Sequence, residues 1–210
     1  MDNLHWEILD EGRIKVVKIL SLFKKNFYLA GGTALALQIG HRYSIDFDLF
    51  TKNSFSTQVL FNKLNEFFFG NELIKVQEEK DTLTVISDEN IKISFFTYPY
   101  ELVKPLIKSK IISLASIEDI GLMKLSAITG RTAFKDYVDL YWILKNIPLA
   151  DLIVLSKQKF RNLDTNLVLK SLVYFDDIKE EPIIYKGAGK VSFKKIKSFL
   201  KHEVGVYLNK

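Results

Sequence analysis

The stretch FYLAGGTALALQIGHRYSIDFDLF, residues 27–50, decides how this sequence folds. It begins with four apolar residues, passes through Gly31-Gly32 and a helix-like segment, and ends in a segment that alternates between polar and apolar residues. On a strand, this alternation places Asp46 and Asp48 on one face and an apolar row, Ile45, Phe47 and Leu49, on the other. Two neighbouring carboxylates repel each other, but Mg²⁺ binds carboxylate oxygens together with substrate phosphates. The stretch therefore indicates a nucleotide-handling site, with the Gly-Gly turn facing phosphates and the Asp pair holding Mg²⁺.

Each part of this pattern is ordinary by itself, because Asp-x-Asp is common on exposed strands and Gly-Gly turns supply unusual backbone angles cheaply. The conjunction is more specific, since strand, Gly-Gly, helix and Asp-x-Asp strand resemble the core of the polymerase-β-like nucleotidyltransferase fold. The runs HRYSIDFDLF at 41–50 and K-L-x-A-I-x-x-R-x-x-x-K-D-Y-x-D-L-Y at 124–141 extend the likeness from about Tyr28 to about Pro182. In these motifs the sequence resembles the AbiEii/AbiGii toxins, nucleotidyltransferases of type IV toxin–antitoxin systems.

Composition bounds the class of protein. The chain has 210 residues, 48% of them hydrophobic, which suits one sizeable domain or a small α/β domain with a helical partner. It has no cysteine, which excludes disulfides and cysteine-based zinc sites and fits a reducing compartment. No signal peptide and no apolar run of the roughly 18 residues that a membrane span needs is apparent, so we expect a cytoplasmic protein without a membrane partner.

Charge favours an anionic partner without demanding one. The formal net charge is +5 at pH 7, and residues 189–210 contain six Lys and one Glu. This basic C-terminal segment suits either a surface that lies along RNA or a solvated helix face, and the sequence leaves both interpretations open.

Periodicity predicts an α+β fold, with a mixed sheet of about five strands followed by a C-terminal helical bundle. The resemblance implies that this sheet belongs to a polymerase-β-like nucleotidyltransferase core. We place the division near residue 105, giving a nucleotidyltransferase core at 1–105 and a helical domain at 106–210. Predicted helices span 2–25, 33–41, 55–69, 117–129, 132–146, 149–160, 164–176 and 191–208; predicted strands span 27–30, 44–50, 73–77, 82–87, 91–98 and, at an edge, 111–115.

A third carboxylate is expected on a later strand, because nucleotidyltransferases of this fold generally carry one. The pattern places that position at Ser94. The metal site would then have two strand carboxylates, unless an acid from the helical half completes it. This departure keeps open a catalytically weak or inactive protein of the same fold that binds nucleotide or RNA without turnover.

A second polar cluster lies in residues 117–144. Lys124, Arg131 and Lys135 are spaced by seven and four residues, and Asp136 and Asp139 share a helix face because they are three apart. Surface salt bridges are the plain interpretation. However, nearly all the residues around the two acids are apolar, which predicts that both carboxylates lie against a packed wall and need partners.

The resemblance implies transfer of a nucleotide from an NTP, in characterised relatives onto the 3′ end of tRNA, with an antitoxin regulator encoded alongside. It implies that the Ser-x-Asp-x-Asp stretch supplies metal and triphosphate ligands, and that Lys124 and Asp139 are needed for activity. The fold also permits a protein or a small molecule, such as an aminoglycoside, as acceptor. The predicted site is Asp46 and Asp48 for Mg²⁺ or Mn²⁺; Gly31, Gly32, Thr33, Arg42, Ser44 and Lys124 for the nucleotide; Asp139 and Asp136 to orient Lys124 or accept a proton; and Arg131 and Lys135 to hold RNA or pair with Asp136.

Overall fold

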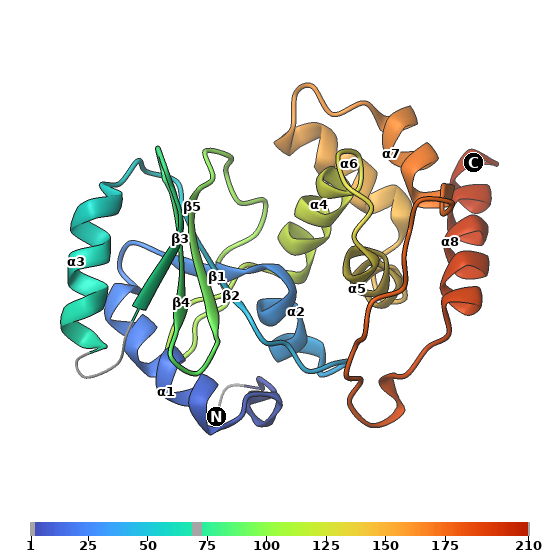
Figure 1. Cartoon of the computed structure of the whole chain (residues 1–210). Coiled ribbons are helices and arrows are strands. Elements are labelled where there is room, and N and C mark those ends of the chain that lie inside the picture. The colour runs from blue at the N-terminus through green and yellow to red at the C-terminus, as the bar shows by residue number, and fades with distance from the viewer. Residues whose placement is uncertain (1–2, 69–72, 210) are drawn as a thin grey trace.

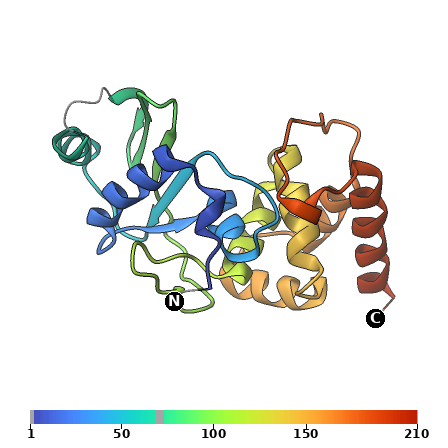
Figure 2. The same cartoon turned by 90° about the horizontal axis from the view of Figure 1, so that it is seen from below.

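The computed structural model describes residues 3–68 and 73–209. Two lobes are visible in Figures 1 and 2: one holds the sheet with α1 and α3, and the other holds α4 to α8. The elements are η1 (Trp6–Ile8), α1 (Glu11–Leu20), η2 (Ser21–Phe23), β1 (Tyr28–Ala30), α2 (Gly31–Ile39), β2 (Phe47–Thr51), α3 (Thr57–Phe67), β3 (Leu73–Glu79), β4 (Thr82–Ser87), β5 (Lys92–Thr97), α4 (Ile117–Ala127), α5 (Phe134–Leu144), α6 (Leu149–Lys159), α7 (Thr165–Val173), η3 (Gly187–Gly189) and α8 (Phe193–Leu208).

The sheet has five strands in the order β1-β2-β5-β4-β3. The central pair, β2 and β5, is parallel, and the other neighbours are antiparallel. The prediction of a mixed sheet of about five strands in an α+β fold is confirmed. Because β2 and β5 are central, side chains on one face of this pair lie at the middle of the molecule, next to the helical lobe.

The alternation that suggested a strand at 44–50 holds only from Phe47 onward. Phe47 and Leu49 are fully buried, as the apolar row predicts, but Ile45 is 48% exposed and does not belong to it. Asp46 precedes β2, whereas Asp48 lies within it. The strand begins late because residues 44–46 follow the turn after α2 and are hydrogen-bonded to side chains of α1 and α2 instead of to the sheet.

Two other predicted elements differ from the structure. The single opening helix at 2–25 is divided into η1, α1 and η2, since Asp10 caps α1 by accepting a hydrogen bond from the Arg13 amide. The predicted edge strand at 111–115 forms isolated bridges to Leu29 and Ile107. The end of the helix predicted at 55–69 falls partly on residues outside the described ranges.

The helical lobe is tied to the segment after β5 through the buried carboxylate of Asp119. Asp119, in the first turn of α4, accepts from the Lys159 ammonium of α6 at 2.6 Å, and both side chains are fully buried. Its carboxylate also accepts from the backbone amides of Val103 and Lys104. These contacts fix residues 103–104 against the helices.

The chain between the two lobes also bonds to the sheet. Leu29 donates to the Ser113 carbonyl and accepts from the Ala115 amide, at 2.9 and 2.8 Å. The domain division near residue 105 therefore stays a prediction. None of the helices in the described ranges combines the length and the hydropathy of a transmembrane segment.

Candidate active site

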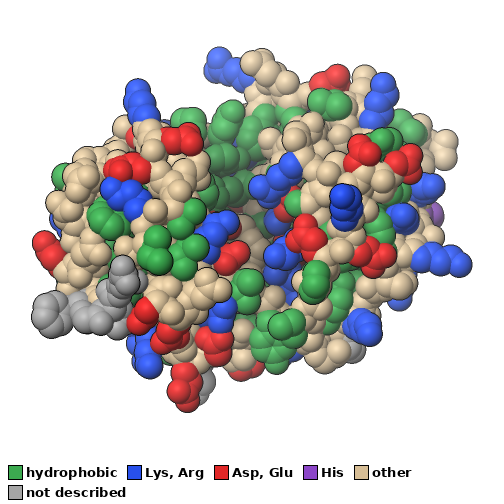
Figure 3. Space-filling view, in the orientation of Figure 1, with side chains coloured by type: hydrophobic (Ala, Val, Ile, Leu, Met, Phe, Trp, Pro, Cys, Tyr) green, Lys and Arg blue, Asp and Glu red, His purple; other side chains and the backbone are tan. Residues whose placement is uncertain are grey.

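A cleft of about 580 Å³ opens over the centre of the sheet, between the lobes. Figure 3 shows this hollow, with hydrophobic side chains gathered in its upper part and charged side chains below them. In the register of the sheet, Asp48 of β2 lies opposite Ala30 of β1 and Ser94 of β5. The cleft is lined by Gly31, Gly32, Asp48, Phe50, Val76, Gln77, Thr84, Lys92, Ser94, Phe96, Tyr98, Met123, Lys124, Ser126, Ala127 and Arg131.

The entry to α2 brings the backbone against Asp48. Gly31 has φ +67°, in the left-handed region that side chains rarely adopt, and a Cβ there would lie 2.8 Å from Asp48 Oδ2. Glycine is thus required both by the backbone angle and by the close approach. The N-terminus of α2 faces the cleft, where its amides and the helix dipole favour phosphate.

Asp48 has no direct partner in the described part of the chain: no salt bridge or hydrogen bond there engages its carboxylate. Burial raises the pKa of Asp48; the charge of Lys92 opposes this effect, and the charge of Asp46 adds to it. The partly buried carboxylate of Asp48 offers the hard oxygen donors that Mg²⁺ and Mn²⁺ prefer, whereas Asp46 is not among the residues that line the cleft. The donor set fits a divalent cation completed by substrate oxygens.

The third position on this face is polar but uncharged. Ser94 is 1% exposed, and the hydroxyl of Thr84 on β4 donates to it at 3.4 Å. Within residues 3–68 and 73–209, no group of three or more His, Cys, Asp or Glu could hold a metal ion. Asp46 and Asp48 therefore remain the predicted pair, without a third acid on the sheet.

Hydroxyls predicted to contact the triphosphate are engaged within the chain. The Thr33 hydroxyl lies against the carbonyl oxygen of Asp46 and 2.7 Å from Ser44 Oγ. Thr33 is 2% exposed and Ser44 is 7% exposed. In this arrangement the two side chains hold the backbone of Asp46 against the first turn of α2.

Lys124 is held between two carboxylates. From α4 its ammonium reaches Asp136 at 2.6 Å and Asp139 at 2.8 Å, both on α5. Burial disfavours the charged ammonium, but the charges of Asp139 and Asp136 outweigh it and raise the pKa of Lys124. Lys124 therefore stays protonated while it lines the cleft with Asp48.

Asp139 is fully buried beneath the cleft, where it also binds the segment after α2. It accepts from Arg42 Nε at 2.9 Å, from Arg42 Nη2 at 3.1 Å and from His41 Nε2 at 2.9 Å. Burial would raise the pKa of Asp139, but the charges of Arg42 and Lys124 hold it well below its usual range. Both of its oxygens are occupied, and Asp139 does not line the cleft.

The two cations predicted to hold RNA are separated by the structure. Arg131 lines the cleft, with its side chain 63% exposed, and donates to Asp136 at 2.8 Å. Lys135 instead lies 3.8 Å from Glu181 and is not among the cleft residues. The cluster holds three cations, from Arg42, Lys124 and Arg131, and two carboxylates, from Asp136 and Asp139, so it carries one surplus positive charge.

Lys92 is a cleft residue that the sequence analysis missed. It lies on β5 two residues before Ser94, so both side chains point to the same face, and its charge is the strongest that lowers the pKa of Asp48. The alternation of Lys92, Ser94 and Phe96 along the strand indicates, from the sequence, that Lys92 shares a face with Ser94.

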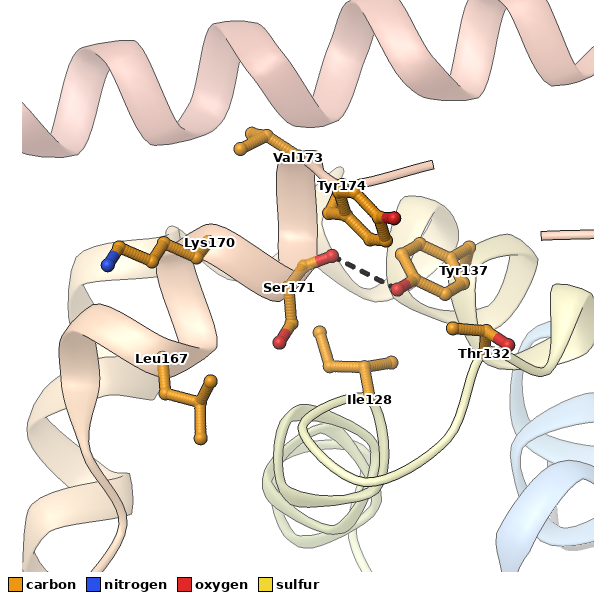
Figure 4. Close-up of a pocket in the computed structure, with 8 residues that line it drawn as sticks. All are labelled: Ile128, Thr132, Tyr137, Leu167, Lys170, Ser171, Val173 and Tyr174. Carbon is orange, nitrogen blue, oxygen red and sulfur yellow. Dashed lines mark hydrogen bonds between the residues drawn. The ribbon is translucent and has the colours of Figure 1, made fainter. Parts of the chain in front are cut away.

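A second concave site lies in the helical lobe and has a different character. This cavity of about 440 Å³ is mostly apolar and opens between the end of α4, α5 and α7 (Figure 4). The Tyr137 hydroxyl closes one side by donating to the Ser171 carbonyl at 3.0 Å. With no carboxylate among the residues that line it, this cavity lacks the groups needed for phosphate chemistry.

Known proteins are similar to this chain in sequence. Residues 17–203 match the family described as "Nucleotidyl transferase AbiEii toxin, Type IV TA system". An uncharacterized protein of Aquifex aeolicus (strain VF5) is 37% identical over 208 residues, covering 94% of this chain and 96% of that one.

Solved structures with low sequence identity have the same fold. A candidate nucleotidyltransferase from H. pylori superposes with a TM-score of 0.64 at 16% identity, covering 94% of this chain and 95% of that one. MenT4, the nucleotidyltransferase toxin Rv2826c from Mycobacterium tuberculosis H37Rv, gives 0.62 at 13% identity, covering 95% and 82%. The resemblance drawn from the motifs is confirmed: this chain belongs to the AbiEii toxin family and is a nucleotidyltransferase.

Proposed function

We propose that the protein transfers a nucleoside monophosphate from an NTP to the 3′ end of an RNA, namely tRNA, with Mg²⁺ as cofactor. The observation that carries this proposal is that Asp48, the N-terminus of α2 and Lys124 line one cleft. Carboxylates, helix amides and a fixed ammonium are the groups that position a triphosphate and neutralise its charge.

The reaction forms a bond between the acceptor 3′ oxygen and the α-phosphorus, and breaks the bond to the pyrophosphate oxygen. Asp46 and Asp48 would hold the divalent cation, which would supply charge neutralisation at the phosphates. The amides of Gly31 and Gly32 and the ammonium of Lys124 would bind the triphosphate as it gains charge on leaving. The proton of the acceptor hydroxyl passes to solvent or to a phosphate oxygen.

For Asp139 the contacts favour orientation over proton acceptance. Its oxygens already bind Lys124, Arg42 and His41, and its low pKa makes it a weak base. Asp136 similarly binds Lys124 and Arg131. We therefore propose that both acids fix the two cations that line the cleft.

The test is incubation of the protein with each α-labelled NTP, Mg²⁺ and total tRNA, followed by separation of the RNA. We expect label on tRNA with at least one nucleotide and a loss of at least about 100-fold in Asp48→Asn, because a cation ligand is removed. Asp151→Asn, an exposed acid on α6, is the matched control and should keep full activity. No transfer by folded protein with any of the four nucleotides would refute the proposal.

An antitoxin regulator encoded alongside is part of the same proposal, as is a location in the cytoplasm, where NTPs and tRNA are present. Expression of the chain alone should slow growth, and Asp48→Asn should relieve the effect. Co-expression with the neighbouring regulator should also relieve it. Growth arrest that persists in Asp48→Asn would contradict toxicity by nucleotide transfer.

Ser94 favours a second candidate function, nucleotide or RNA binding without turnover. It occupies the position opposite Asp48 where this fold generally carries a third acid. This alternative predicts Mg²⁺-dependent NTP binding by calorimetry that is lost in Asp48→Asn, without any labelled product. Detection of product in the transfer assay excludes it.

A further inference from the structure

A row of aromatic side chains leaves the candidate active site along the sheet. Tyr28, Phe50 and Phe96 lie opposite one another across β1, β2 and β5, on the same face as Asp48. The Phe50 ring centroid is 6.1 Å from that of Tyr28 and 5.3 Å from that of Phe96. Two strand residues span about 7 Å, so the row begins about that far from the Asp48 backbone.

The aromatic row continues outward through the segment after β5. Ring centroids are 5.8 Å apart for Phe50 and Tyr98, 5.0 Å for Tyr98 and Tyr100, and 4.9 Å for Tyr100 and Phe160. Phe50 and Tyr98 line the catalytic cleft, whereas Tyr28 and Tyr100 line a neighbouring cavity of about 610 Å³. The row therefore connects the two cavities, and Tyr100 is 44% exposed.

Four lysines and two tyrosines line this neighbouring cavity, which we call the aromatic–lysine groove. They are Lys24, Lys25, Lys52, Lys104, Tyr28 and Tyr100. All four lysines are exposed. Lys52 pairs with Glu101, but no ion pair in the described residues engages Lys24, Lys25 or Lys104. Clustered cations without counter-ions attract a polyanion.

The nucleotide does not need these lysines. Its triphosphate would be met at the catalytic cleft by α2, Lys124, Arg131 and the cation held by Asp48. The groove lysines line a cavity that shares no lining residue with the cleft, so they can bind a different anionic ligand. Aromatic rings that stack bases, combined with cations that follow the backbone, are the means by which proteins bind single-stranded nucleic acid without sequence preference.

We infer that the aromatic–lysine groove binds the single-stranded 3′ segment of the acceptor RNA and leads its terminal hydroxyl to Asp48. This inference rests on the proposed transfer to RNA. It places the acceptor on the sheet lobe, away from Lys135 and from the basic helix α8, which lies at the far end of the helical lobe (Figure 1).

RNA binding, measured without turnover, tests the role of the groove lysines. In an Asp48→Asn background, a fluorescent single-stranded RNA of about 12 nucleotides is titrated at several salt concentrations and followed by anisotropy. Lys24→Gln with Lys25→Gln should weaken binding about tenfold and reduce the slope of log K against log salt by about 1.4, because two phosphate contacts at about 0.7 each are lost. Lys194→Gln with Lys195→Gln removes the same charge from α8 and should change affinity less than about twofold.

Stacking is tested at Tyr100. Tyr100→Ala should weaken RNA binding about tenfold, whereas Tyr100→Phe should keep it, because the ring face supplies the interaction. Circular dichroism confirms that each variant is folded. The inference is overturned if the Lys24/Lys25 variant binds RNA as tightly as its parent, if the α8 variant loses more, or if an acidic peptide of matched charge binds as tightly as RNA.

The transfer assay separates this inference from the proposed function. In otherwise wild-type protein, the Lys24/Lys25 variant should raise KM for RNA about tenfold and leave KM for the NTP unchanged. If wild-type protein labels RNA and the variant keeps its RNA KM, the groove assignment is wrong. If wild-type protein labels no RNA while the groove variants still lose RNA binding, the groove stands and the proposed transfer fails.

Discussion

Asp139→Asn should strongly destabilise the protein, although Asp139 does not line the cleft. The carboxylate is fully buried and accepts from Arg42, His41 and Lys124 at 2.8–3.1 Å. Removing one partner of a buried ion pair costs about 3–5 kcal/mol, because the remaining charge is left uncompensated. For a chain of this length about 1 kcal/mol corresponds to 2–4 °C, so the melting temperature should fall by about 6–20 °C.

Two variants test whether the uncompensated charge is the cause. Arg42→Gln combined with Asp139→Asn should recover part of the loss, since Arg42 has no other ion pair in the described residues. Asp136→Asn should cost less than Asp139→Asn, because its partner Arg131 is 63% exposed and its other partner, Lys124, keeps Asp139 as a counter-ion. Differential scanning calorimetry at pH 7.5 measures all three variants.

The loss of stability caused by Asp139→Asn should depend on pH in a defined direction. The pKa of Asp139 is held below its usual value of about 3.9, so its stabilisation is fully present above that pH and is lost as pH falls through the lower, folded-state value. The difference between wild type and Asp139→Asn should therefore be constant at neutral pH and shrink in acid. A melting temperature within about 3 °C of wild type at pH 7.5 would refute the reasoning.

Three further changes have defined outcomes. Burial lowers the pKa of His41, so the free energy of unfolding should fall by up to about 1.4 kcal/mol per pH unit below about pH 6.5. The stability of His41→Gln should depend less on pH, and urea denaturation at several pH values measures the difference. Gly31→Ala should lower the free energy of unfolding by about 1–3 kcal/mol and remove most activity, because φ at this position is +67° and the added Cβ would meet Asp48. Gly130→Ala should keep both stability and activity, because a Cβ there would meet nothing within 4 Å. Asp48→Asn should raise the melting temperature measured without metal by about 2–4 °C, because a desolvated charge costs about 1 kcal/mol. The same variant should lack the rise in melting temperature that Mg²⁺ gives the wild-type protein. An unchanged response to Mg²⁺ would exclude Asp48 as a metal ligand.

Local patterns predicted much of the fold. The Gly-Gly turn and the alternation at Asp48 predicted β1, α2 and β2, and the alternation on β5 identified Ser94 as the position of a third acid, which the register places opposite Asp48. Ile45 was assigned to the buried row because alternation says nothing about where a strand begins. The structure begins β2 at Phe47.

Partners far apart in the sequence could not be predicted in this way. Arg42 and Asp139 are 97 residues apart, and no periodicity reveals that the first occupies both oxygens of the second. Lys135 precedes Asp136 on α5, but one residue turns a helix by about 100°, so its side chain reaches Glu181 and not the cleft. The roles of these residues in the site stay predictions.

The buried charge cluster explains how residues from two lobes can form one cleft. Asp48 and Gly31 belong to the sheet lobe, whereas Lys124 belongs to α4 in the helical lobe. The position of the ammonium relative to the carboxylate therefore depends on how the lobes are joined. Arg42, just after α2, and Lys124 meet on the same Asp139 of α5, so one buried carboxylate fixes both lobes at this point. Asp139 would then act on nucleotide transfer through the position of Lys124, which explains how a residue outside the cleft could be needed for activity.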